Sequence, residues 1–396
     1  MIQHPLSKLI EKAKALTSPG AGLKSSRRSR GDDAQRLFCS QPFTRFEVLG
    51  GGGDRGDAFF CCQNWVTKSL GNMQERSVAE VWNGKAARDF RRSILDGSFK
   101  FCKADVCPYL QRVDGPVQRV EDVRDDRLRE VIDKRQTFLP YGPRDVICCF
   151  DQSCNLSCPT CRTHVIMETA HGTAITRIQK RLEDEALKQA KLLYITGSGD
   201  PFGSPYFRRW LQTMKCSAMP ELECIHLHTN GLLWTRRIWH SIPEETRALV
   251  TAATISVDAA TAETYATNRR GGDFATLMKR LEFIGELRKE GPLKYLEIHM
   301  TVQANNFREM PAFVSLGDRF GCDRVTFHQL LDWGTFSAAD FAARAVQNPG
   351  HPDHREFLRM LRDPRLQSPI VYLSNLTDLS RKGGAPQLTH GAHATA

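Results

Sequence analysis

Cys154, Cys158 and Cys161 lie within eight residues of one another, in the segment Cys-Asn-Leu-Ser-Cys-Pro-Thr-Cys. The gaps of three and two residues are too tight for all three to share a helix face or a strand face, but a loop can turn three sulfurs toward one point. Crowded thiolates favour an iron–sulfur cluster or zinc. A four-iron cluster and a tetrahedral zinc ion each require four ligands, and the next cysteine after this segment is Cys216. One metal position is therefore left without a protein ligand, as in catalytic rather than structural metal sites.

The context of this loop resembles the radical S-adenosylmethionine (radical SAM) superfamily, whose members hold a [4Fe-4S] cluster by a CxxxCxxC loop. An apolar run at 146–150, typical of a buried strand, precedes the loop, and helix-forming sequence at 174–190 follows it. The resemblance implies that the methionine part of S-adenosylmethionine (AdoMet) takes the fourth iron. The alternative is a structural zinc knuckle, but no fourth Cys or His falls at zinc-finger spacing.

A second group of cysteines lies upstream, between residues 37 and 113. This stretch resembles the SPASM/twitch modules of radical SAM enzymes in three segments: 61–65 (Cys-Cys-Gln-Asn-Trp), 69–83, and the stretch from Cys102 to Cys107. The resemblance implies an auxiliary [4Fe-4S] cluster held by Cys39, Cys62, Cys102 and Cys107, with Cys61 as a spare that can replace Cys62. The module precedes the strand-rich part instead of following it, and a zinc-stapled minidomain is the alternative.

Strand-like and helix-like segments alternate from residue 144 onward, which indicates an α/β fold with a parallel sheet and helices outside it. The expected strands are 146–151, 192–196, 224–228, 253–258, 296–303 and 324–330. The radical SAM resemblance implies that they curl into a partial (β/α)6 barrel, preceded by the small cysteine-rich SPASM/twitch-like domain. Within that domain we expect a hairpin of strands 43–48 and 57–62 and a helix at 77–97.

The 396 residues are enough for two domains with sizeable cores. We expect five regions: a basic, flexible tail (1–36), the auxiliary cluster domain (37–113), a helical connector (114–143), the radical SAM partial barrel (144–336), and a partly disordered C-terminal extension with one helix (337–396).

Ligands of such sheets bind at the carboxyl ends of the strands. The second strand leads into Gly197, Ser198, Gly199 and Asp200, and the third into Asn230. Glycines let a backbone approach a ligand closely, and the carboxylate offers an acceptor for an ammonium. The first four match the family's GGE-type motif, which implies that Asp200 holds the methionyl amine. Asn230 lies near the cofactor or, alternatively, caps a helix.

The fourth strand ends in Ser256 and Asp258, followed by Arg269 and Arg270. This pattern resembles the SxD…R stretch of SPASM-associated enzymes, which implies that Ser256 and Asp258 lie by the ribose and that either arginine meets the methionyl carboxylate by charge-assisted hydrogen bonds. Val302, at the end of the fifth strand, is expected to pack on adenine.

The sixth strand leads to His328 and Asp332, the expected catalytic acid/base residues. A single histidine on a strand more often has a structural role.

The net charge is +10, and residues 1–36 hold eight Lys/Arg against three Asp/Glu. This tail lacks the interleaved aromatics of a nucleic-acid binder, so a solvated segment is the favoured interpretation and nucleic acid an unlikely partner. No run has the apolar length of a membrane span, and thirteen cysteines without a secretion signal indicate a cytoplasmic location.

The resemblance implies an enzyme that reductively cleaves AdoMet to a 5′-deoxyadenosyl radical and abstracts hydrogen from its substrate, with an electron donor such as flavodoxin or ferredoxin as partner. We expect oxidation or modification of a sugar or aminocyclitol, helped by one auxiliary cluster. The alternatives are a peptide-modifying maturase that cross-links or epimerises its substrate and, from another class, a non-enzymatic iron–sulfur carrier or RNA-binding module.

Overall fold

The computed structural model describes residues 37–50 and 55–382. The expected tail (1–36), the glycines at 51–54 and the last residues (383–396) lie outside the described residues. The chain divides into two compact units. Within the described residues, the first comprises 37–155, 164–255 and 280–296, and the second comprises 156–163, 256–279 and 297–382.

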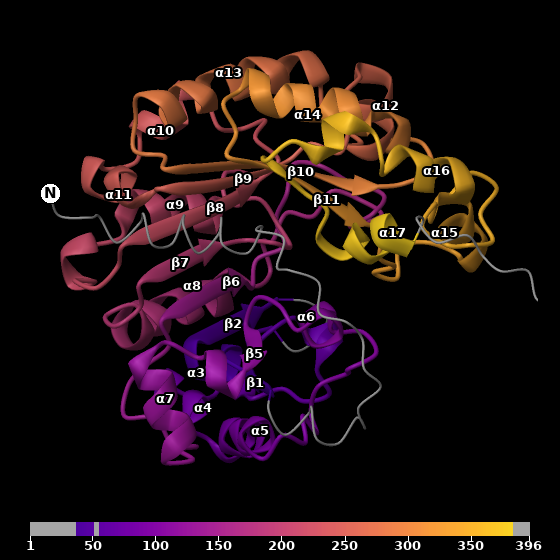
Figure 1. The fold of residues 1–396 in the computed structure, drawn as a ribbon. Helices are drawn as coiled ribbons and strands as arrows, with labels where there is room; N and C mark the ends of the chain where they lie inside the picture. The colour runs from indigo at the N-terminus through magenta and orange to yellow at the C-terminus, as the bar shows by residue number, and fades with distance from the viewer. Residues whose placement is uncertain (1–36, 51–54, 383–396) are drawn as a thin grey trace, which may run out of the picture. The chain divides into compact units, whose positions relative to one another are not determined.

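A sheet in the order β4-β3-β2-β6-β7-β8-β9 forms the centre of the first unit (Figure 1). β2, β6, β7 and β8 pair in parallel, as do β8 and β9, whereas β3 and β4 complete the edge in antiparallel pairing. β9 is buried at every position and β6 at all but its first, as expected where helices cover both faces of a parallel sheet. The strands are β2 (Arg45–Leu49), β3 (Asp57–Phe59), β4 (Gly71–Asn72), β6 (Asp145–Cys149), β7 (Leu192–Ile195), β8 (Cys224–Thr229) and β9 (Ala252–Ser256).

A two-stranded antiparallel sheet, β1 (Leu37–Cys39) with β5 (Val117–Arg119), also belongs to the first unit. The helices of this unit are α3 (Gln41–Thr44), α4 (Val78–Trp82), α5 (Lys85–Leu95), α6 (Pro108–Arg112), α7 (Asp126–Asp133), α8 (Gly172–Arg181), α9 (Pro205–Thr213), α10 (Arg236–His240), α11 (Glu244–Leu249) and the latter part of α13 (Phe274–Lys289).

Arg91 of α5 ties the cysteine-rich part of the first unit together. Its fully buried guanidinium donates to the carbonyl oxygens of Pro42 (2.8 Å) and Thr137 (3.0 Å) and to Asn83 Oδ1 (3.0 Å). It also lies 4.4 Å from the ring centroid of Trp82. Burial lowers the pKa of Arg91 to about 9. A buried charge is tolerated only when it is hydrogen-bonded, and the three groups that accept from Arg91 come from three different chain segments. The Arg91 cation therefore holds these segments together.

The second unit contains the parallel strands β10 (Tyr295–Val302), β11 (Arg324–Gln329) and β12 (Val371–Tyr372). β10, which belongs to this unit from Glu297 onward, alternates strictly between half-buried and fully buried residues. One of its faces is therefore closed off by packing. The helices here are α12 (Ala262–Asn268), the start of α13, α14 (Met310–Arg319), α15 (Ala338–Arg344), α16 (His354–Met360) and α17 (Thr377–Lys382).

The predicted α/β class is confirmed, and the six expected strands appear as β6 to β11 with bounds shifted by at most two residues. At least one helix separates each consecutive pair along the chain. The expected hairpin is also confirmed, with Glu47 paired to Phe59. Among the described residues, none of the helices combines the length and the apolar character needed to cross a membrane.

Three segments differ from expectation. The helix predicted over 77–97 is two helices, α4 and α5, because the chain turns at Asn83 and Gly84, where a Cβ on the glycine would lie 2.5 Å from the carbonyl oxygen of Glu80. The stretch 114–143 contains β5 as well as α7, and the extension after 337 contains α15, β12 and α17 besides α16. Strand β2, inside the expected auxiliary domain, pairs directly with β6. The expected domain boundaries stay predictions.

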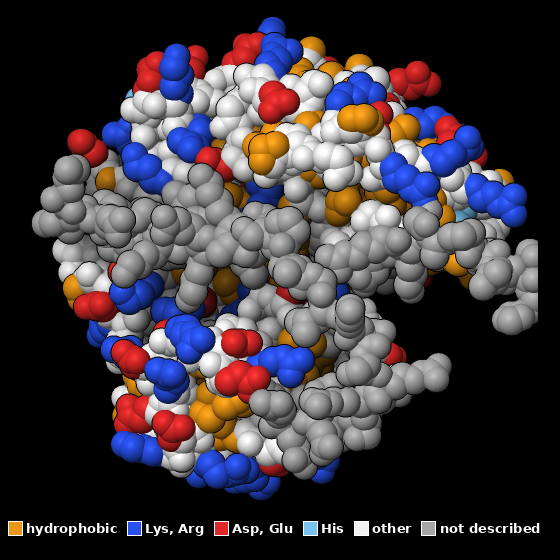
Figure 2. All heavy atoms as spheres, viewed as in Figure 1, with side chains coloured by type: hydrophobic (Ala, Val, Ile, Leu, Met, Phe, Trp, Pro, Cys, Tyr) orange, Lys and Arg blue, Asp and Glu red, His pale blue; other side chains and the backbone are white. Residues whose placement is uncertain are grey.

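One face of the protein carries mixed charge over its described residues (Figure 2). On the face drawn in Figure 2, Lys and Arg side chains are interspersed with Asp and Glu side chains over the described residues. This mixture is typical of a solvated protein surface rather than of a single-sign docking patch.

Candidate functional site

The loops that follow β6, β7 and β8 are joined by buried hydrogen bonds in the first unit. Asp151 accepts from the backbone N–H of Ser153 (2.9 Å) and from the hydroxyl of Ser204. The backbone N–H of Asp200 donates to the carbonyl oxygen of Ser153 (2.9 Å). The chain just before Cys154 is therefore held in place by the loop after β7.

Asp200 is fully buried, and its carboxylate accepts four hydrogen bonds. One oxygen accepts from the N–H groups of Phe202 (3.0 Å) and Gly203 (2.8 Å). The other accepts from the Thr229 hydroxyl (2.7 Å) and the Asn230 N–H (2.8 Å). These four donors occupy the lone pairs of a carboxylate. In this structure Asp200 connects the loop after β7 to the loop after β8 and offers no exposed oxygen to an ammonium.

The residues before Asp200 lie tightly against the end of β6. A Cβ at Gly199 would lie 2.4 Å from the carbonyl oxygen of Asp151, so only glycine fits there. The hydroxyl of Ser198 donates to the carbonyl oxygen of Cys149 (2.9 Å). A Cβ at Gly197 would have the sulfur of Cys149 at 3.6 Å, an ordinary contact. Gly199 is thus required by the loop packing itself.

Asn230 follows β8 and contacts the start of the cysteine loop. Its Nδ2 lies 3.6 Å from Cys154 Sγ and donates to Asn155 Oδ1 at 2.9 Å. Its Oδ1 accepts from the N–H of Leu232 (3.0 Å). Both expected roles therefore apply in part: the side chain caps a local turn, and it also faces the first cysteine.

Cys158 and Cys161 belong to the second unit. Arg269 lies 3.7 Å from Cys158 Sγ through one guanidinium nitrogen and pairs with Asp258 through another (2.8 Å). The second carboxylate oxygen of Asp258 accepts from the N–H of Thr301 (2.7 Å). Burial raises the pKa of Asp258, against the lowering effect of Arg269. Arg269 and Asp258 therefore both interact with other groups of the protein.

Arg270 holds the middle of the cysteine loop. Its guanidinium donates to Ser157 Oγ (3.1 Å) and to the carbonyl oxygen of Thr163 (2.8 Å), and its own carbonyl accepts from the N–H of Ser157 (3.1 Å). Arg162 contributes within the loop, with a guanidinium nitrogen 3.3 Å from Cys161 Sγ.

Histidines lie on the half-buried faces of β10 and β11. Ser256 Oγ and His299 Nε2 are 3.1 Å apart, and the rings of His299 and His328 meet edge to face at 5.7 Å. Burial lowers the pKa of His328, which favours its neutral form. Val302 lies on the opposite, fully buried face of β10 and has no exposed surface to offer a base. Asp332 is exposed and accepts from the N–H of Gly334 (2.8 Å).

A hollow in the cysteine-rich part of the first unit brings four thiols together. Its lining comprises Cys39, Cys61, Cys102 and Cys107 with Gln41, Pro42, Trp65, Phe90, Phe99, Tyr109, Leu110 and Val117. Burial, and secondarily the neighbouring Cys107, raises the pKa of Cys102 to about 12. Burial likewise raises the pKa of Cys39 and Cys61, and each is raised further by neighbouring thiols of the set. The donor set suits an iron–sulfur cluster, since four thiolates are its usual ligands.

Cys62 lies outside the lining of this hollow. Burial raises its pKa, and Glu47 and Arg45, which also act on the pKa of Cys61, are among the charged groups that act on it. Arg45 and Glu47 form an ion pair at 2.8 Å on β2. The same pair acts on the pKa of Cys149 at the end of β6, with Cys62 as a further influence.

Among the described residues, no three His, Cys, Asp or Glu side chains are placed so that they could hold a single metal ion. A [4Fe-4S] cluster binds each thiolate to a different iron, so its ligands are spread more widely than those of one zinc ion.

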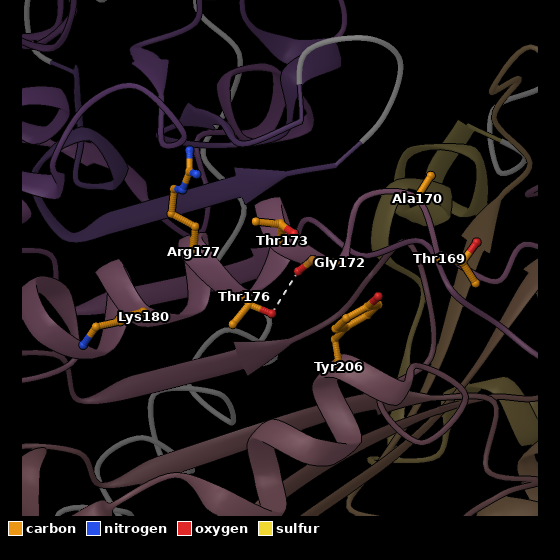
Figure 3. Close-up of a pocket in the computed structure, with 8 residues that line it drawn as sticks. All are labelled: Thr169, Ala170, Gly172, Thr173, Thr176, Arg177, Lys180 and Tyr206. Atoms are coloured by element: carbon orange, nitrogen blue, oxygen red, sulfur yellow. Dashed lines mark hydrogen bonds between the residues drawn. The ribbon is translucent and has the colours of Figure 1, made fainter.

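Another hollow, of about 690 Å³, lies beside the first turns of α8. Gly172, Thr176 and Lys180 of α8 and Tyr206 of α9 are among its lining residues. Figure 3 shows the side chains of Arg177 and Lys180 pointing in different directions. Lys180 also pairs with Asp184 (2.9 Å). The cations do not converge on one point, so this hollow is not a built anion site.

Sequence reasoning missed Arg162 and His299. Arg162 directly follows the last loop cysteine, and that adjacency was the available signal. His299 lies on β10 at the position where strand alternation turns side chains to the half-buried face, so the alternation itself could have indicated it.

The family described as SPASM, iron–sulfur cluster-binding domain, matches residues 39–108. No curated protein matches the chain.

Parts of the chain are similar to solved structures. SuiB of Streptococcus suis is 16% identical over 47% of this chain and 40% of its own, with a TM-score of 0.33. The structure named anSMEcpe, with bound AdoMet and the Cp18Cys peptide, is 20% identical over 48% and 50%, with a TM-score of 0.33. TYW1 with a lysine-pyruvate adduct is 15% identical over 55% and 70%, with a TM-score of 0.33.

The matched segment contains all four cysteines of the hollow, Cys39, Cys61, Cys102 and Cys107. Residues 39–108 therefore match the model of the SPASM family of iron–sulfur cluster-binding domains.

Proposed function

We propose that this protein is a radical SAM enzyme that cleaves AdoMet reductively and abstracts hydrogen from an organic substrate. The observation that carries the proposal is the loop of Cys154, Cys158 and Cys161, which follows β6 and leaves one ligand position open. Cys154, Cys158 and Cys161 would hold a [4Fe-4S] cluster, which would supply the electron for reductive cleavage of AdoMet.

The residues of this chain position the reactants and keep water away from them. Gly197 and Ser198 present backbone to the methionyl group, while Gly199 and Asp200 hold the loop that carries them. Ser256 lies by the ribose. Arg270 supplies positive charge for the methionyl carboxylate.

Proton transfer is the proposed task of His328. Burial lowers its pKa, so the ring is in the neutral form that a proton acceptor requires. His299, in edge-to-face contact with it, orients the ring. Asp332 stays a predicted proton acceptor on the exposed segment that follows β11.

The auxiliary cluster is proposed to bind Cys39, Cys61, Cys102 and Cys107, because these four thiols line one hollow. Residues 37–113 hold five cysteines, enough for one cluster of four ligands. A single auxiliary cluster suits removal of one electron from a substrate radical, which gives net oxidation. We therefore place a sugar or aminocyclitol first as substrate and a peptide second, with flavodoxin or ferredoxin as the electron donor.

The test uses anaerobically reconstituted protein with dithionite and AdoMet. We expect release of 5′-deoxyadenosine, measured by chromatography, and an increase in that release with a substrate of the correct class. Aminocyclitols, sugars and ribosomal precursor peptides are assayed side by side, and stimulation by peptide alone would reverse the order of the two substrate classes. Fully reconstituted protein that releases no 5′-deoxyadenosine would contradict the proposed function.

Single substitutions of the two adjacent cysteines separate the auxiliary ligand from its neighbour. Cys61→Ala will lose the auxiliary cluster, about four irons per chain, because it removes a thiol from the hollow. Cys62→Ala will keep those irons, and it is the matched control because the two residues are adjacent and chemically identical. Iron and sulfide analysis of both purified variants provides the measurement. Loss of iron from Cys62→Ala with retention in Cys61→Ala would favour the set with Cys62 instead.

A further inference from the structure

Each sulfur of the cysteine loop has a nitrogen donor beside it. Asn230 Nδ2 lies 3.6 Å from Cys154 Sγ within the first unit. Within the second unit, Arg269 lies 3.7 Å from Cys158 Sγ and Arg162 lies 3.3 Å from Cys161 Sγ. All three distances fall within reach of an N–H···S hydrogen bond.

The three donors come from different parts of the chain; Asn230 and Arg162 are buried and Arg269 is half-buried. The residues Asn230, Arg162 and Arg269 have little exposed surface, the side chain of Arg269 being 11% exposed. A thiol sulfur is a weak acceptor, and burying an amide or a guanidinium against it recovers little of the lost hydration. A thiolate is a much stronger acceptor, because hydrogen bonds to an ionised partner are roughly twice as strong as neutral ones. The donors therefore match sulfurs that carry negative charge.

We propose that Asn230, Arg162 and Arg269 are hydrogen-bond donors to the three cluster thiolates and that they set the reduction potential of the loop cluster. The proposal rests on the function proposed above, since it needs a cluster at this loop. Reduction adds negative charge to the cluster and its sulfurs. A donor stabilises the reduced state more than the oxidised state, and hydrogen bonds to the sulfurs are one of the established determinants of cluster potential.

The positive charge of Arg269, the donor to Cys158, is largely neutralised by a neighbouring carboxylate. Asp258 pairs with the same guanidinium at 2.8 Å, so Arg269 brings a directed N–H group with little net charge. Arg162 and Asn230 complete the set with one cationic and one neutral donor. The reduction potential of the loop cluster thus depends on three side chains that are not cluster ligands.

The experiment measures the midpoint potential of the loop cluster by redox titration with electron paramagnetic resonance, with the cluster identified by the change in its signal when AdoMet is added. The variants are Asn230→Leu, Arg162→Met and Arg269→Lys. In each variant we expect the midpoint potential to become more negative by about 59 mV. For a one-electron couple this shift lowers the ratio of reduced to oxidised cluster at a fixed potential about tenfold. Asn230→Ser replaces the leucine variant if that chain does not fold, because its hydroxyl is too short to reach the sulfur.

The matched control is Arg308→Met. This removes a guanidinium from the same unit, but one that pairs with Asp353 (3.2 Å) and Glu356 instead of contacting a sulfur. Its midpoint should stay close to that of the wild type. Unchanged midpoints in all three donor variants, with loop iron intact, would overturn this inference and leave the proposed function standing. A wild-type protein that binds no iron at the loop would overturn both.

Discussion

Replacing Cys154, Cys158 and Cys161 together with alanine will abolish release of 5′-deoxyadenosine while about four of about eight irons per chain remain. The three thiols are the ligands that we assign to the AdoMet-cleaving cluster, and without them an electron cannot be delivered to the sulfonium. The remaining irons belong to the auxiliary hollow lined by Cys39, Cys61, Cys102 and Cys107, in the SPASM domain. Chromatography of the nucleoside products and iron, zinc and sulfide analysis of the same preparations measure both effects.

A matched triple variant with Cys216, Cys224 and Cys322 changed to alanine serves as the control. It removes the same number of thiols from positions outside the loop and the SPASM domain, so its iron content and its nucleoside release should equal those of the wild type. Undiminished release from the loop variant would contradict the assignment of the cluster. A loop variant without iron but with one zinc would assign zinc to the SPASM domain, and one with neither metal would contradict an auxiliary centre.

The parallel strands of this chain were predictable because burial on both faces makes them short, continuous apolar runs between helical segments. β6 and β9 show this directly, with nearly every residue buried. The cysteine loop was predictable for a related reason: its chemistry is contained in eight consecutive residues and needs no knowledge of distant contacts. Local patterns thus provided the fold class and the first metal site.

Features that depend on pairing between distant segments were not predictable in the same way. Nothing local to β2 indicates that it pairs with β6 across almost a hundred residues of intervening chain. The choice between Cys61 and Cys62 depends on which of two adjacent thiols reaches the hollow lined by Cys39, Cys102 and Cys107, and the local sequence does not specify it. The acceptor role of Asp200 toward Thr229 and Asn230 likewise needs the loops after β7 and β8 to be adjacent.

Asp200→Ala will destabilise the protein by roughly 3 kcal/mol or more, because it leaves buried donors without an acceptor and each unsatisfied donor costs about 1–3 kcal/mol. The affected groups are the N–H groups of Phe202, Gly203 and Asn230 and the hydroxyl of Thr229. Loop iron should fall as well, because the loop that Asp200 stabilises holds the chain just before Cys154 through the Asp200 N–H and the Ser153 carbonyl oxygen (2.9 Å). Chemical denaturation followed by circular dichroism gives the free energy of unfolding, and iron analysis gives the second quantity.

Asp332→Ala is the control for this prediction. Its carboxylate is exposed and accepts one backbone hydrogen bond, from Gly334, so its loss should change the free energy of unfolding by at most about 0.5 kcal/mol. The sequence-based role for Asp200, an acceptor for the methionyl ammonium, gives a different pattern. In that case Asp200→Ala would keep its stability and its iron and would lose only AdoMet affinity, by about ten- to hundredfold, since one charge-assisted hydrogen bond contributes about 1.5–3 kcal/mol. Calorimetric titration of AdoMet into Asp200→Ala, read beside the denaturation curve, decides between a residue that holds the ligand and one that holds the loops around it.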